Sequence, residues 1–201
     1  HPRFNWVYRP GTVRKGSVNV NPHLYKAVEL MLEWSKKQDM NALQKADLIE
    51  WTMIYAGQKM EVLINQVQDA LYENRIDEAK RRFALFKVLG VKLDRLLTLH
   101  PCHRAELWVE RARKAGVTSK EKEHYEENAK RIITVWGPPV DDYSSRVWSG
   151  VIRDYYIPRW EQWFKMRLQG HYPELADWEE NWVKKSKGFC DFLFGCLGRC
   201  E

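Results

Sequence analysis

Histidine and cysteine are the first residues to test for chemistry, because they ligate metals and act as nucleophiles. The cysteines are Cys102, Cys190, Cys196 and Cys200, and His100 and His103 flank the first of them. No pair among these residues has the C-x-x-C or H-E-x-x-H spacing that directs two ligands to one ion. A Cys–His pair built on Cys102 stays open, but an inert thiol is the ordinary interpretation of a lone cysteine. We therefore expect no metal ligands and no cofactor.

Asp141 and Asp142 are an adjacent carboxylate pair beside an aromatic-rich segment. A catalytic pair in a glycosidase must flank the scissile bond, with the carboxyl groups roughly 5–5.5 Å or 6.5–9.5 Å apart. Neighbouring loop residues usually point apart and would both lie on one side of a sugar. We expect Asp142 to bind local backbone groups and fix its loop, and we reject the pair as acid and base.

The segment from Trp136 to Tyr143 carries the strongest site signal from the residues alone. The pair Pro138-Pro139 prevents it from being helical. A stiff loop that presents Trp136 and Tyr143 at a helix edge could form one wall of a pocket. The alternative is a hydrophobic cluster packed beneath the loop. The residues alone leave both interpretations open.

The elements that must position this loop are helices. We expect helices over residues 21–38, 41–74, 77–99, 103–115, 118–136, 144–170 and 173–188. The second has apolar residues at alternating steps of three and four, which is typical of a helix packed lengthwise on others; they are Ala46, Ile49, Met53, Ala56, Met60, Leu63 and Val67. The third has a similar seam at Ala79, Phe83, Phe86, Leu93 and Leu97. In the fifth we expect Tyr125, Ala129, Ile132 and Trp136 on the buried face.

Capping residues mark several of these boundaries. Asn21, Asn41, Asp77 and Thr118 are expected to cap helices at their N-termini, Thr118 as a capping box with Glu121. Ser144 or Ser145 is expected to cap the sixth helix, and Gly116 to end the fourth in the left-handed conformation. Pro158 removes a backbone donor inside the sixth helix and should kink it.

Composition fits a globular all-α protein. The chain has 201 residues, 44% of them hydrophobic and 30% charged, and no run is long and apolar enough for a membrane span. We predict an array or bundle of about seven helices (residues 21–188), preceded by an irregular N-terminal segment (1–20) and followed by a Cys-rich tail (189–201). Because the chain begins with His1, we expect a processed or excised product, and the lack of a signal peptide is uninformative.

Several strings resemble the end of the α-N-acetylglucosaminidases, the family 89 glycoside hydrolases. They are Trp136-Gly137-Pro138, Asp142-Tyr143, Trp148-Ser149-Gly150, Arg153-Asp154-Tyr155-Tyr156-Ile157-Pro158-Arg159-Trp160, Ala46-Asp47-Leu48-Ile49 and Arg9-Pro10. The likeness runs from near residue 6 to about 165, and the Tyr-Tyr-x-Pro-Arg-Trp string is its most specific part.

The resemblance implies a function that the residues alone do not. Family members have a small N-terminal domain, a (β/α)₈ catalytic barrel and an all-α C-terminal domain, which this chain resembles. They remove terminal α-linked N-acetylglucosamine from glycans with retention, using two barrel glutamates that lie outside the matching region. The resemblance implies a secreted, periplasmic or lysosomal protein. It also implies substrate-lining roles for Trp136, Tyr143, Val140 and Ile49, and no catalytic residue in this chain.

Two other function classes stay open. The first is a helical protein-interaction module, which would show a large exposed apolar face. The second is a polyanion-binding domain, which the net charge of +6 permits. Because the basic residues are spread along the chain, we expect no nucleic acid as a partner.

Overall fold

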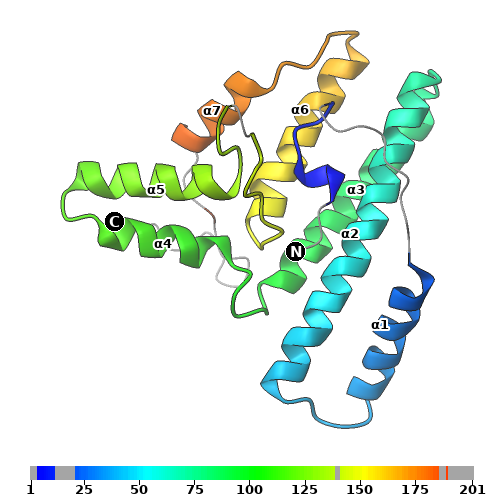
Figure 1. The fold of residues 1–201 in the computed structure, drawn as a ribbon. Coiled ribbons are helices and arrows are strands. Elements are labelled where there is room, and N and C mark those ends of the chain that lie inside the picture. The colour runs from blue at the N-terminus through cyan, green and yellow to red at the C-terminus, as the bar shows by residue number, and fades with distance from the viewer. Residues whose placement is uncertain (1–3, 12–20, 139–140, 186–188, 190–201) are drawn as a thin grey trace.

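The computed structural model describes residues 4–11, 21–138, 141–185 and 189. Within them the chain forms seven α-helices and no strand, which confirms the all-α prediction. The elements are η1 (Asn5–Val7), α1 (Pro22–Ser35), α2 (Ala42–Tyr72), α3 (Ile76–Leu97), α4 (Ala105–Ala115), α5 (Ser119–Ile133), η2 (Ile152–Tyr156), α6 (Ile157–Leu168) and α7 (Ala176–Lys185). Figure 1 shows α2 and α3 at the centre, α1 beside α2, and the α4–α5 hairpin projecting to the opposite side.

The α2–α3 pair forms the backbone of the core. The predicted α3 seam is buried at every position, and the α2 seam is buried at Ile49, Met53, Ala56, Met60 and Val67. The helices approach closely where Gly90 faces Met60 and Ile157, because a Cβ at residue 90 would lie 2.9 Å from the Ile157 side chain. The three–four periodicity therefore predicted the buried face of α3 and most of that of α2, where Ala46 and Leu63 are only partly buried.

The N-terminal segment packs into this core. Trp6 is fully buried, and its indole N–H donates to the Gly57 carbonyl on α2 at 3.0 Å. The Phe4 ring covers Gly57 so tightly that a Cβ there would lie 2.3 Å from it. Glu61 accepts the backbone N–H groups of Asn5 at 2.8 Å and Trp6 at 3.3 Å.

The aromatic segment after Gly150 is helical, but it begins later than predicted. Residues 141–150 form turns and extended backbone, so neither Ser144 nor Ser145 caps a helix. The first turns, η2, are a π-helix, and α6 continues from it with Pro158 in its first turn. In a π-helix the backbone hydrogen bonds span five residues instead of four. This change occurs next to Pro158, which has no N–H to donate. Ile152, Tyr155, Tyr156, Trp160, Trp163 and Phe164 are buried.

Helix boundaries were predicted correctly at some ends and wrongly at others. Asn21 caps α1, Asn41 caps α2, and Thr118 with Glu121 forms the capping box of α5. Asp77 does not cap α3, which begins one residue before it with Arg75 as the capping residue. Gly116 has an extended rather than a left-handed backbone, at φ −77°. Its need for glycine is steric, because a Cβ would lie 2.6 Å from the Lys122 nitrogen.

Two further findings concern the buried face of α5 and the search for a membrane-spanning helix. Tyr125, predicted on the buried face of α5, is 39% exposed, and that face is formed by Ala129, Lys130 and Ile133. Among the described residues, no helix combines the length and the apolar character that a bilayer crossing requires.

Candidate functional site

The loop after α5 is closed by backbone hydrogen bonds. The Trp136 N–H donates to the Arg131 carbonyl at 2.8 Å, which ends the helix. The Asp142 N–H then donates to the Val135 carbonyl at 2.9 Å, so the chain returns to its starting point. A backbone hydrogen bond therefore joins the two ends of this loop. Trp136 belongs to the loop and not to the last turn of α5.

Two loop residues have unusual backbone conformations. Trp136 has φ 59° and Asp142 has φ 60°. Aspartate tolerates this left-handed region, but a bulky tryptophan does so rarely. Strained residues persist only where the surrounding structure fixes them, and they are common at functional sites.

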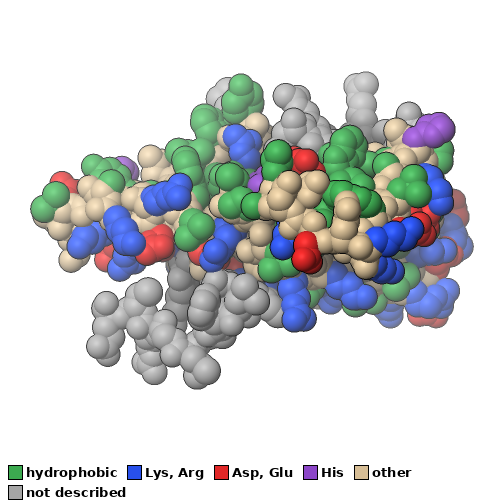
Figure 2. Space-filling model, turned by 90° about the horizontal axis from the view of Figure 1, so that it is seen from below, with side chains coloured by type: hydrophobic (Ala, Val, Ile, Leu, Met, Phe, Trp, Pro, Cys, Tyr) green, Lys and Arg blue, Asp and Glu red, His purple; other side chains and the backbone are tan. Residues whose placement is uncertain are grey.

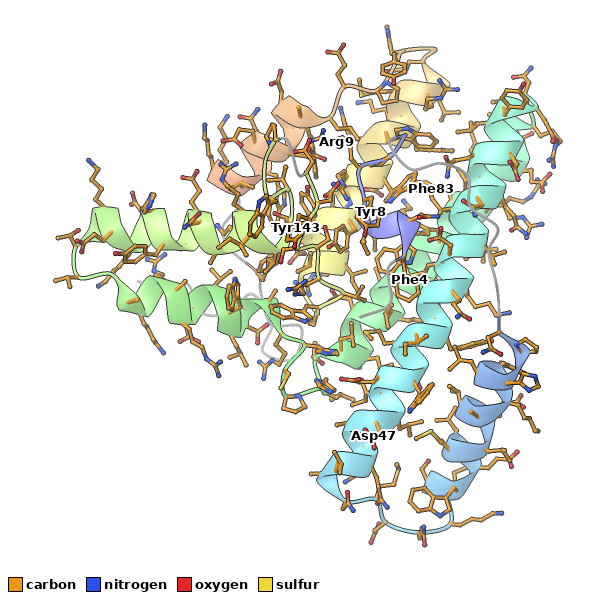
Figure 3. All side chains as sticks on the ribbon, in the orientation of Figure 1. Phe4, Tyr8, Arg9, Asp47, Phe83 and Tyr143 are labelled. Atoms are coloured by element: carbon orange, nitrogen blue, oxygen red, sulfur yellow. The ribbon has the colours of Figure 1, made fainter. Side chains whose placement is uncertain are left out.

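The two aromatic residues of the loop face the solvent and contact each other. Trp136 is 37% exposed and Tyr143 is 72% exposed. Their ring centroids are 5.6 Å apart in an edge-to-face arrangement. Figure 3 shows Tyr143 where the end of α5, the η2 segment and the N-terminal segment meet. These two rings are therefore not part of a hydrophobic cluster packed beneath the loop, which was the alternative interpretation.

A buried network of charges holds the loop from below. We call Arg9, Asp142, Arg159 and Glu179 the charge network. Arg159 donates to Asp142 at 2.8 Å, to Glu179 at 3.0 Å and to the Val7 carbonyl at 2.6 Å. The Arg9 backbone N–H donates to Asp142, and its guanidinium donates to Glu179 at 2.9 Å. The network joins the N-terminal segment, the loop, α6 and α7 at one point.

The electrostatics of this network are those of buried, compensated ions. Burial raises the pKa of Asp142, and the neighbouring Arg159 guanidinium opposes that rise. Burial lowers the pKa of Arg159, but Tyr155, Asp142 and Glu179 raise it by more, so the guanidinium stays charged. The guanidinium also lies over the Tyr155 ring, 4.7 Å from its centroid. Such groups hold position; they are poorly placed to exchange protons with a substrate.

Asp142 does hold its loop, but the prediction that it does so through local backbone groups is wrong, because its carboxylate binds the backbone N–H of Arg9 and the guanidinium of Arg159. Asp142 is 3% exposed and bound to Arg159, and Asp141 pairs with Arg9 at 2.9 Å. Arg9, Arg159 and Glu179 were missed as loop-positioning residues. Arg9 and Arg159 lie in strings singled out in the sequence, whereas nothing local distinguishes Glu179 from other helix-surface glutamates.

The other predicted site residues lie elsewhere. Ile49 is 8% exposed and packs in the hydrophobic core, so its side chain faces the helix seam. Val140 lies outside the described residues. Two surface cavities are described. One, of about 430 Å³, is lined by residues that include Tyr72, Trp163 and Arg167, and the other by residues that include Phe83 and Phe164. Neither of these two cavities is lined by Trp136 or Tyr143.

Comparison with known proteins gives one consistent answer. The family model described as "Alpha-N-acetylglucosaminidase (NAGLU) C-terminal domain" matches residues 3–191. The human alpha-N-acetylglucosaminidase is 25% identical over 164 residues, which cover 80% of this chain and 22% of the human one.

Solved structures agree on the fold. A family 89 glycoside hydrolase from Clostridium perfringens in complex with PUGNAc superposes with a TM-score of 0.78 at 23% identity, over 90% of this chain and 23% of that one. A variant of the Clostridium perfringens enzyme in complex with its substrate, GlcNAc-alpha-1,4-galactose, gives 0.77 at 23% identity. The chain thus spans less than a quarter of the length of each of these relatives. Since the family model covers nearly the whole chain, this protein belongs to the alpha-N-acetylglucosaminidase C-terminal domain family.

Proposed function

We propose that this domain completes the substrate pocket of an exo-acting α-N-acetylglucosaminidase, with the loop from Trp136 to Tyr143 as its contribution. The substrate is a glycan with a terminal α-linked N-acetylglucosamine, which fits the substrate complex of the Clostridium perfringens relative. The bond is cleaved by two glutamates of a (β/α)₈ barrel in the same enzyme. We propose that the enzyme containing this domain is secreted, periplasmic or lysosomal.

The observation that carries the proposal is the exposed, strained Trp136 beside Tyr143 on a loop anchored by buried ions. The network beneath the loop fixes its backbone, and the two rings are 37% and 72% exposed. The indole can offer an apolar face to a sugar ring, and the phenol can bind a sugar oxygen. Both contacts orient substrate without moving a proton.

The charge distribution favours this role over polyanion binding. Figure 2 shows basic, acidic and hydrophobic side chains interspersed over one face of the molecule. Many basic side chains are paired, for example Arg131 with Glu180 at 2.7 Å and Lys87 with Glu161 at 2.7 Å. A polyanion site needs a contiguous basic surface.

The first test uses this chain by itself. Purified and folded, it should not turn over an aryl α-N-acetylglucosaminide above the uncatalysed background, because it supplies no acid–base pair. Turnover that survives repurification would show a catalytic pair within the domain and overturn the proposal.

The second test uses the complete enzyme, in which this domain is joined to its barrel. Trp136→Ala should lower kcat/KM at least about tenfold, mostly by raising KM, because a pocket contact is worth roughly 1–3 kcal/mol. Tyr143→Phe should have a smaller effect, about 2–10-fold, since one neutral hydrogen bond is lost. Tyr172→Ala is the matched control, because Tyr172 is also exposed, at 81%, and lies outside the loop. Equal kinetics for the loop variants and the control would contradict the proposal.

A further inference from the structure

Two histidines and a glutamate converge at the end of the core pair opposite to α7. Glu50 lies in the third turn of α2, near the labelled Asp47 in Figure 3. His100 follows the end of α3, and His103 precedes α4. One Glu50 carboxylate oxygen lies 3.5 Å from His100 Nε2 and 3.6 Å from His103 Nε2. The three ligand atoms all lie within 4.8 Å of one another.

We propose that Glu50, His100 and His103 bind a divalent ion of the zinc class, with water completing the coordination. Zinc–ligand bonds of about 2.0–2.1 Å in a tetrahedron place neighbouring ligand atoms roughly 3.3–3.4 Å apart. The observed separations of 3.5 and 3.6 Å are already close to that value. Two imidazoles and one carboxylate are ligands that zinc takes in protein sites with an open position. The proposal stands apart from the substrate-pocket function and does not depend on it.

Burial favours a defined site over a mobile surface cluster. The side chains of His100 and His103 are 6% and 12% exposed, whereas Glu50 is 50% exposed and leaves a path for the ion. The His103 Nδ1 is buried and has no hydrogen-bond partner, so the polar contact available to this ring lies on its Nε2 side. The two rings are stacked with centroids 4.0 Å apart, which already fixes their relative position.

One hydrogen bond opposes binding and limits the affinity. The Cys102 backbone N–H donates to His100 Nδ1 at 3.1 Å, which places the proton of a neutral ring on Nε2. A metal at Nε2 requires that proton to move to Nδ1, and the Cys102 N–H must then turn away. We therefore expect this rearrangement to weaken binding, with no net release of a proton from His100.

Spacing rules could not find this site, because no ligand pair follows a known motif. His100 and His103 lie on the two sides of a turn, and Glu50 comes from a helix 50 residues earlier. An ion bound there would link α2 to the turn between α3 and α4. It should therefore stabilise the folded chain as well as bind to it.

The experiment is a zinc titration of the complete chain by calorimetry. Cys190, Cys196 and Cys200 are first replaced by serine, so that their thiolates do not compete. We expect one ion per chain and a higher melting temperature with zinc. We also expect cobalt(II) to give the visible absorption of a low-coordinate site. Glu50→Gln should weaken binding at least about tenfold, and it should fold, because Glu50 is half exposed.

Two further variants make the result decisive. His103→Gln should abolish one-to-one binding, while His23→Gln, which changes an exposed histidine on α1, should leave it unchanged. Circular dichroism of each variant without metal separates a lost ligand from a lost fold. The proposal is overturned if the parent shows no stoichiometric binding, or if Glu50→Gln and His103→Gln bind zinc as the parent does.

Discussion

The α2–α3 seam and the charge network are equally buried, but different forces hold them. The seam is neutral, with Met60, Ile64 and Phe86 at 0% exposure. In the network, Arg159 and Glu179 are also at 0% exposure and Asp142 is at 3%. Apolar packing depends on shape and volume and tolerates exchange of similar residues. A buried ion depends on the presence of each partner, because a charge left alone inside a protein is costly.

The comparison explains why the candidate site rests on the second region. Apolar packing alone would favour a loop conformation with both rings buried, because burying an indole removes apolar surface from water. Directed bonds from Arg9 and Arg159 to Asp142 fix the loop backbone and keep Trp136 at the surface. We therefore infer that the ionic contacts fix the position of the loop.

The largest expected effect breaks the network at its centre. Arg159→Ala should destabilise the fold by about 3–5 kcal/mol, because Asp142 and Glu179 lose their shared counter-ion. Met60→Leu, at an equally buried seam position, should cost less than about 1.5 kcal/mol. Urea unfolding of both variants measures the difference. Similar losses would mean that the two regions are held in the same way.

A second prediction extends the comparison through pH, at a buried carboxylate of α3 that lies outside the charge network. Asp94 accepts the N–H groups of Gly150 at 2.7 Å and Arg153 at 3.1 Å. Burial raises the pKa of Asp94 to about 6, more than the attraction of Arg153 lowers it. Between the ordinary aspartate pKa and about 6 the folded chain thus holds a proton that the unfolded chain has lost. This group's contribution is greatest at low pH and falls as pH rises through that window, by at most about 3 kcal/mol.

The matched variant is Asp94→Asn, which keeps an oxygen for both N–H donors and cannot ionise. Melting temperatures from pH 4 to pH 8 should show the variant gaining on the parent as pH rises, until the difference levels off above about pH 6.5. A constant difference across this range would show that Asp94 titrates normally.

The smallest expected effect lies away from both regions. Thr118→Ala removes the bond from the Glu121 N–H to the threonine hydroxyl at the start of α5, and should cost about 1 kcal/mol. Ser119→Ala is the control, because it alters the next residue without removing that bond. If the two variants unfold at the same urea concentration, the capping box contributes nothing measurable.

The two regions also differ in how far sequence predicts them. Periodicity identified the buried positions of α2 and α3, since one side chain per turn repeats wherever two helices pack lengthwise. It failed at Trp136, which fits the step of four from Ile132, because a period does not show that the helix stops at Ile133. Trp136 and Tyr143 were singled out as candidates through the Pro-Pro loop and the family resemblance, and their role as site residues stays a prediction. The partners of Asp142 could not be found, because they are the Arg9 backbone N–H and the Arg159 guanidinium and no local pattern links these residues.

The burial of Trp6 also limits how far the N-terminus of this domain can be shortened. A chain shortened to begin at Asn21, the first residue of the predicted helical region, would lack Trp6 and Arg9. The Gly57 carbonyl and the Glu61 carboxylate would lose their donors, Glu179 would lose one of its two arginines, and an indole-sized void would open between α2 and α6. We therefore expect a chain that keeps residues 4–11 to be more stable than one that begins at Asn21, although these residues contain no α-helix.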